Sequence, residues 1–128
     1  MSIEKFNTIT KENIHKVVLE FYVSILFDDN VVSEVFKERL GEDVTTVHWQ
    51  EHFHILTNFW AMMILKDDQY KGNPTKRHME FGLTKEMFPI WLEMFFEVVD
   101  SRYEEHLAQI FKTKANIVAK GFMKMLNL

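Results

Sequence analysis

The sequence predicts an all-α protein, and three features support that prediction. Apolar residues recur every three or four positions over long stretches, which is the spacing of helices with one buried face. Only two prolines and four glycines occur among 128 residues, so little of the chain suits the turns between many short strands. Short segments rich in capping and turn residues separate the apolar stretches. The chain is therefore expected to fold into a few long helices.

The first helix is expected to begin after Thr10, a residue type that caps helix N-termini, and to run to about Leu26. The turn-prone residues 28–30 end it. A shorter helix follows, and Gly41 stands where a C-cap glycine would. The apolar positions of these two helices share helical spacing: Ile14, Val17, Val18, Phe21, Ile25, Val31, Val32, Val35, Phe36 and Leu40.

The third helix is expected to start at Thr45 or Thr46, either of which can cap it, and to fade at residues 66–68. One side of it carries large side chains and a histidine: Trp49, His52, Phe53, Leu56, Phe59, Trp60 and Met63. The turn at residues 72–74 follows, where Pro74 suits the first position of a helix. Only four or five helical residues fit before the chain reaches residues 81–82.

Two further long helices are expected in the C-terminal part of the chain. Thr84 is expected to cap the first, and Pro89 either bends that helix or marks its true beginning. Its buried stripe is Phe88, Trp91, Leu92, Phe95, Val98 and Val99. The last helix carries apolar residues from Leu107 to Met125, with a lysine-rich face (Lys112, Lys114, Lys120, Lys124) that is expected to be solvated. The prediction is four long helices and two short ones.

Composition limits the classes of function. The formal net charge of −4 and the pI near 5.8 argue against a nucleic-acid partner, since such proteins usually carry a basic face. The chain has no cysteine, which excludes disulfides and thiolate metal sites and suits the reducing cytoplasm. The polar start is no signal peptide, and no run of about 20 apolar residues is present to span a membrane. We expect one cytoplasmic domain over residues 1–128, acting as a monomer.

Histidines are the candidate metal ligands. His48 and His52 lie four residues apart and can reach one metal from a helix face, but the order HWQEH is not the metalloprotease motif. Glu51 and His54 form the E-x-x-H unit that di-iron helical bundles use. Such bundles need a second unit and two more carboxylates, and the chain offers no second unit. A non-haem di-iron bundle is therefore kept only as an alternative.

A haem pocket is the other iron site to consider. It needs a neutral imidazole as axial ligand, apolar walls and an open opposite face. His78, on the short segment after Pro74, meets the first requirement. Tyr22 and Trp91 lie on apolar helical faces, where a buried hydroxyl and indole N–H need partners, and a diatomic ligand on iron would supply one. A tyrosine on a helix face can equally be a core residue with its hydroxyl at the surface.

Four segments, in their order and spacing, carry a family resemblance: FYVSILFDDNVVSEVF, HWQEHFHILTNFW, YKGNPTKRH and FPIWLEMFF. Together they resemble the bacterial group III truncated haemoglobins, over roughly residues 10–118. That family implies a short globin with a two-over-two helical sandwich around haem. Group III members lack paired-glycine motifs, and this sequence likewise contains no Gly-Gly.

The resemblance implies a role for each matching residue. His78 corresponds to the proximal ligand of haem b, and Tyr22, His52 and Trp91 to distal residues that stabilise the bound ligand. Residues implied to line the haem are Phe21, Phe36, Leu56, Phe59, Trp60 and Phe95. Tyr70, Lys76 and Arg77 are implied propionate contacts, although residues 76–77 can equally be a solvated charge run.

His48 and His54 have no counterpart in the pattern. We expect both to point outward; the alternative is that one competes with His52 for the iron or relays protons.

The implied function is binding of O₂ and related small ligands (NO, CO, cyanide) at a proximal-histidine iron. Donors on two sides favour O₂, NO or peroxide chemistry over bulk storage, such as NO dioxygenation or peroxide reduction with an unidentified reductase. Whether the chain is an enzyme is left open. Besides the di-iron bundle, a cofactor-free globin-like sensor or interaction domain remains an alternative.

Overall fold

The computed structural model describes residues 4–70 and 83–128, and within them it contains five helices and no strand. The helices are α1 (Lys11–Phe27), α2 (Val31–Leu40), α3 (Val47–Leu65), α5 (Met87–Arg102) and α6 (Glu105–Met125). The prediction of an all-α protein is confirmed. The short helix expected after Pro74 lies outside the described residues. None of the described helices is long and apolar enough to cross a lipid bilayer.

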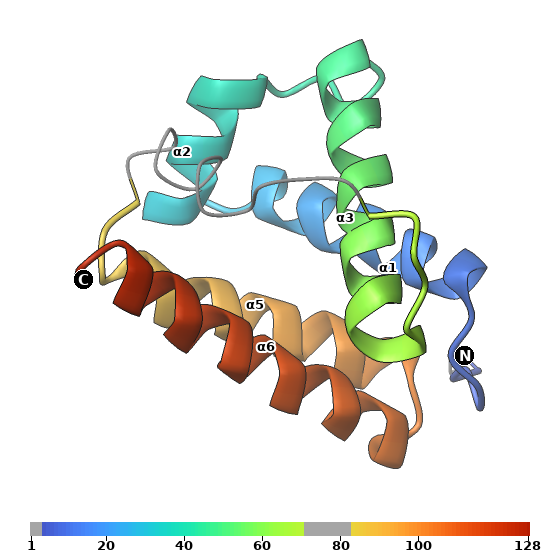
Figure 1. Ribbon diagram of the computed structural model, residues 1–128. Coiled ribbons are helices and arrows are strands. Elements are labelled where there is room, and N and C mark those ends of the chain that lie inside the picture. The colour runs from blue at the N-terminus through green and yellow to red at the C-terminus, as the bar shows by residue number, and fades with distance from the viewer. Residues whose placement is uncertain (1–3, 71–82) are drawn as a thin grey trace.

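The helices pack as two crossed pairs. Helix α1 packs against α3, and α5 packs against α6. Figure 1 shows α5 and α6 side by side with opposite chain directions, and the other helices above them. Contacts of α1 and α2 with α5, and of α3 with α6, join the two layers. This is the two-over-two arrangement that the sequence resemblance implied.

The predicted cap at Thr10 is confirmed and has a reciprocal form. The Thr10 hydroxyl accepts from the backbone N–H of Asn13 at 3.1 Å, and the Asn13 side-chain oxygen accepts from the Thr10 N–H at 3.0 Å. The same Asn13 oxygen also accepts from the hydroxyl of Tyr103 at 2.6 Å, and the Asn13 amide donates to the Thr8 carbonyl. Because Tyr103 is fully buried where α5 ends, this network ties the start of α1 to the second layer.

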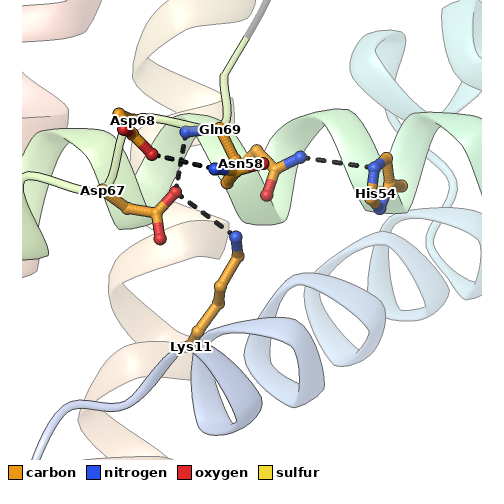
Figure 2. Close-up of polar contacts among 6 residues, drawn as sticks. All are labelled: Lys11, His54, Asn58, Asp67, Asp68 and Gln69. Atoms are coloured by element: carbon orange, nitrogen blue, oxygen red, sulfur yellow. Dashed lines mark hydrogen bonds and ion pairs between the residues drawn. The ribbon is translucent and has the colours of Figure 1, made fainter.

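The ends of α2 and α3 follow the predicted signals. Gly41 forms the C-cap of α2 with a positive φ of 81°. Of the two candidate caps for α3, Thr46 is the one used, and its side chain accepts from the N–H of Trp49. Beyond the end of α3, Asp67 accepts from Lys11 at 3.3 Å and from the Gln69 backbone, as Figure 2 shows. These contacts hold the end of α3 against the start of α1.

The predicted cap of α5 was wrong. Helix α5 begins at Met87, and its N-cap residue is Glu86, without a side-chain capping bond. Thr84 lies before this position and contributes its carbonyl to the N–H of Met87. Pro89 is thus the third residue of the helix, in the first turn, where an N–H has no intrahelical partner to lose. Of the two alternatives, Pro89 marks the beginning of the helix and does not bend it.

Three alanines and one phenylalanine form the buried face of α6: Ala108, Phe111, Ala115 and Ala119. Ile110 and Ile117 are exposed. Alanine side chains let neighbouring helices approach closely, and they are easily overlooked in a pattern of large apolar residues. Lys112 also departs from the expected solvated face, since it pairs with Asp100 at 2.7 Å and lies over the ring of Phe96.

Candidate functional site

All five described helices contribute to one pocket that opens to the surface. Its walls are mostly apolar, and it encloses about 1390 Å³ including the open space at its mouth. Apolar walls of this kind are typical of sites that hold a largely apolar ligand. The lining residues are Tyr22, Val32, Val35, Phe36, Leu40, His48, Glu51, His52, Ile55, Leu56, Phe59, Trp60, Tyr70, Leu83, Met87, Phe88, Trp91, Val118, Ala119 and Phe122.

Most of the predicted site residues that the structure describes meet in this pocket. They come from α1, α2, α3 and α5 and from the segment after α3, and they are Tyr22, Phe36, His52, Leu56, Phe59, Trp60, Tyr70 and Trp91. Three others, Lys76, Arg77 and the candidate axial ligand His78, lie outside the described residues. The pocket therefore brings together the candidate distal residues and the candidate wall.

Phe21 and Phe95 do not line the pocket but lie behind it. Both are buried, and the ring of Phe95 is parallel to those of Trp91 and Trp60, with centroids 5.4 and 4.9 Å away. Phe21 meets Trp91 and Phe95 edge to face. These two residues therefore pack behind the residues that line the pocket and support them from the core.

Tyr22 is enclosed by other rings. His52 stands nearly perpendicular to it with centroids 4.8 Å apart, and Phe21 and Phe36 lie at 4.8 and 5.2 Å. Burial raises the pKa of the Tyr22 hydroxyl far above its ordinary value, and a hydrogen bond with the Trp91 side chain offsets part of that rise. At neutral pH the hydroxyl therefore keeps its proton and can donate it in a hydrogen bond.

The interaction of Trp91 with the Tyr22 hydroxyl, which lowers the pKa of that hydroxyl, has only one possible direction. An indole N–H can only donate, so the Tyr22 oxygen is the acceptor. Trp91 is half-buried and lines the pocket together with Tyr22. Two side chains from different layers thus place an O–H and an N–H on the same pocket.

The two histidines without a family counterpart differ in position. His54 is exposed, and its ring Nε2 lies 3.3 Å from the amide nitrogen of Asn58, one turn along the same helix (Figure 2). His48 is also exposed, but it lines the pocket together with the exposed Glu51. The prediction that both histidines point outward agrees with the position of His54, whereas His48 lies at the mouth of the pocket.

The pocket walls include residues that the sequence did not single out as a site. They are mainly aliphatic or aromatic and come from α2, α3, α5, α6 and the segment before α5: Val32, Val35, Leu40, Ile55, Leu83, Met87, Phe88, Val118, Ala119 and Phe122. Helical spacing marks several of them as buried. Spacing alone does not say which of two buried neighbours faces a cavity and which faces the core.

The chemistry of the pocket fits haem better than a carboxylate-bound metal pair. Among the residues that the structure describes, no group of three or more His, Cys, Asp or Glu side chains is arranged to hold a metal ion. The described residues therefore supply no further ligands that would complete a di-iron site with Glu51 and His54. Apolar walls with a few hydrogen-bond donors on one side match a flat, mostly apolar cofactor that binds a small polar ligand.

Comparisons with known proteins agree with this geometry. No family model matches the chain. Group 3 truncated hemoglobin ctb from Campylobacter jejuni is 32% identical over 123 residues, which cover 95% of this chain and 94% of that protein. The crystal structure of group III truncated hemoglobin from Campylobacter jejuni matches with a TM-score of 0.86 at 32% identity, covering 96% of this chain and 95% of that one. The chain therefore belongs to the group III truncated haemoglobins, a family of globin-type proteins that bind ligands at haem.

Proposed function

We propose that this chain binds haem b in the pocket with His78 as axial ligand, and that Tyr22, Trp91 and His52 act on a small ligand at the iron. The observation that carries the proposal is the buried Tyr22 side chain, which lies among aromatic rings and lines a mostly apolar pocket. Donors that are buried in an apolar site are normally satisfied by a partner. A polar ligand at the pocket centre would provide an acceptor for the Tyr22 proton.

The apolar wall is suited to hold the porphyrin. Phe36, Leu56, Phe59 and Trp60 present aliphatic and aromatic surface to the pocket. Tyr70, the last described residue before position 71, lines the pocket, and we propose it as a propionate contact together with Lys76 and Arg77. Solvent-exposed ion pairs generally contribute under about 1 kcal/mol, so the apolar contacts would provide most of the affinity for haem.

Haem, when bound, would supply an iron that takes O₂, NO or CO in its ferrous state and cyanide in its ferric state. The chain supplies oriented donors in a mostly apolar pocket, and such donors stabilise negative charge wherever it develops on a ligand. Tyr22 needs no reorganisation to donate, because the surrounding rings fix its position. We therefore propose O₂, NO or peroxide chemistry in preference to bulk O₂ storage, with reduction of the iron by a separate reductase.

One set of absorption spectra tests the cofactor and its axial ligand. The purified protein is measured as isolated, after reduction, and after reduction with CO, for wild type, His78→Ala and His54→Ala. We expect an intense Soret band in wild type and in His54→Ala, because His54 is exposed and turned toward Asn58. His78→Ala should lose or strongly shift that band. A wild-type protein that stays colourless when haem is offered would instead support a cofactor-free sensor or interaction domain.

A further inference from the structure

One tryptophan that is not among the predicted site residues is buried against the distal residues of α1 and α3. Trp49 of α3 is fully buried and does not line the pocket. Its ring is stacked on Phe36 of α2 with centroids 6.2 Å apart, and it lies 5.9 Å from the ring of Tyr22 of α1. The imidazole of His52 meets it edge to face at 5.5 Å. Trp49 is thus the common neighbour of three residues that do line the pocket.

The indole of Trp49 is held in turn by the backbone. Its Nε1–H donates to the carbonyl oxygen of Gly41 at 2.8 Å. Gly41 has φ 81° and ψ 179°, a combination that is essentially restricted to glycine. A Cβ at this position would meet no heavy atom within 4 Å, so backbone conformation and not lack of space requires the glycine. One hydrogen bond therefore links the end of α2 to the ring behind the distal residues.

We propose that Trp49 is a positioning residue of the distal pocket. Anchored on Gly41, it fixes the rings of Tyr22 and His52, so that the backbone turn after α2 sets how the Tyr22 hydroxyl meets a ligand. The physical reason is that hydrogen bonds weaken steeply as the donor leaves its optimal angle, and a ring displaced by a few tenths of an ångström changes that angle. This inference rests on the proposed function, since it assumes a ligand in the pocket.

Two variants break the same link from opposite ends and provide the test. Trp49→Phe removes the N–H and part of the ring, and Gly41→Ala forces the turn out of its glycine-only conformation without a steric clash of the added Cβ. For each holoprotein we expect O₂ to dissociate about threefold to tenfold faster, the effect of one weakened hydrogen bond. The CO stretching band of the reduced CO complex should move to higher wavenumber, as expected when fewer donors face the CO oxygen.

The double variant sharpens the test. Because either change already breaks the link, Trp49→Phe combined with Gly41→Ala should affect the O₂ dissociation rate no more than Trp49→Phe alone. Multiplicative effects of the two changes would overturn the proposal. If Trp49→Phe does not fold, Gly41→Ala decides alone, and an unchanged CO band in that variant would overturn the proposal as well.

Tyr103→Phe is the matched control. Tyr103 is equally buried and also loses one hydrogen bond, from its hydroxyl to Asn13 at 2.6 Å, but its observed ring partners are Phe6 and Phe111 and not the distal residues. The Tyr103→Phe change should lower the melting temperature and leave the CO band in place. If Trp49→Phe also lowers the melting temperature without moving the CO band, Trp49 has only a structural role and the positioning role is refuted. Absence of a Soret band in wild type would instead refute the proposed function itself.

Discussion

Tyr22 and Trp91 interact across the two helix layers: the Trp91 side chain lowers the pKa of the Tyr22 hydroxyl, against the larger rise caused by burial. Because an indole N–H can only donate, this interaction leaves the Tyr22 proton for another acceptor in the pocket. Burial keeps that proton in place by raising the pKa of the hydroxyl. We expect the pair to act as a polarised donor, with Trp91 increasing the capacity of Tyr22 to donate.

Tyr22→Phe should accelerate O₂ dissociation from the reduced holoprotein by about tenfold to a hundredfold. The expectation follows from losing one hydrogen bond to a partly charged ligand, about 1.5–3 kcal/mol. CO carries little charge, so its dissociation rate should change much less. Stopped-flow displacement of each gas measures the two rates. Equal effects on both gases would point to altered access to the pocket and not to a lost donor.

Trp91→Phe should have a smaller effect on O₂ dissociation, about threefold to tenfold, because it removes a donor that acts partly through Tyr22. The ring of Phe95 behind it keeps an aromatic neighbour in this variant. The informative quantity is the double variant with Tyr22→Phe. The O₂ dissociation rate of this double variant should increase by less than the product of the two single-variant increases, because the residues act as one unit. Independent effects would show that each residue meets the ligand separately.

Alkaline pH should destabilise the fold through two buried tyrosines. Burial raises the pKa of Tyr22 and of Tyr103, so both keep their protons when folded, whereas an unfolded chain releases them above about pH 10. Above that pH the unfolded state binds fewer protons, and stability falls by up to about 1.4 kcal/mol per pH unit for each tyrosine. Urea unfolding between about pH 9 and about pH 11 measures the slope.

The phenylalanine variants separate the two contributions to this pH dependence. Tyr22→Phe and Tyr103→Phe should each make the fall in stability with pH less steep, since each removes one group that titrates only when unfolded. Below about pH 9 the stability of each variant should not vary with pH more than that of wild type. A slope that neither variant changes would mean that other groups govern the alkaline limb.

The sequence predicts which helix faces are buried, but not how deep each residue lies. Phe21 and Tyr22 are adjacent and both buried, yet only Tyr22 reaches the pocket, because neighbours on a helix point about 100° apart and crossing helices decide which direction is a cavity. His48 and His52, four residues apart, share a helix face and both line the pocket, whereas His54 lies on another face. Helical spacing accounts for this grouping only once the structure is known.

Other features could not be read from the sequence because they depend on tertiary contacts. Trp49 looks like one more apolar residue in its stripe, and its bond to Gly41 depends on the path of the chain between α2 and α3. Thr45 and Thr46 are equivalent as sequence signals, and only the path of the chain selects the second. The apolar stripe of α1, the cap at Thr10 and the glycine end of α2 depend on local chemistry, and they were predicted correctly.

Asn13→Ala should cost about 2–4 kcal/mol of unfolding free energy, although Asn13 lies away from the pocket. The change removes the reciprocal cap of α1 and leaves the buried Tyr103 hydroxyl without its acceptor. Asn116→Ala is the control, because that exposed amide bonds only to the Lys112 carbonyl one turn back, and it should cost no more than about 0.5 kcal/mol. Urea unfolding at neutral pH measures both.

A second substitution separates the network from the cap. In the Asn13→Ala background the Tyr103 hydroxyl has already lost its acceptor, so Tyr103→Phe should cost less there than in wild type and can even restore stability. If Tyr103→Phe costs the same in both backgrounds, the bond from Tyr103 to Asn13 contributes nothing to stability. The loss in Asn13→Ala would then come from the helix cap alone, and the link between α1 and the end of α5 would depend on the backbone bonds of Phe6 with Arg102 and Glu104.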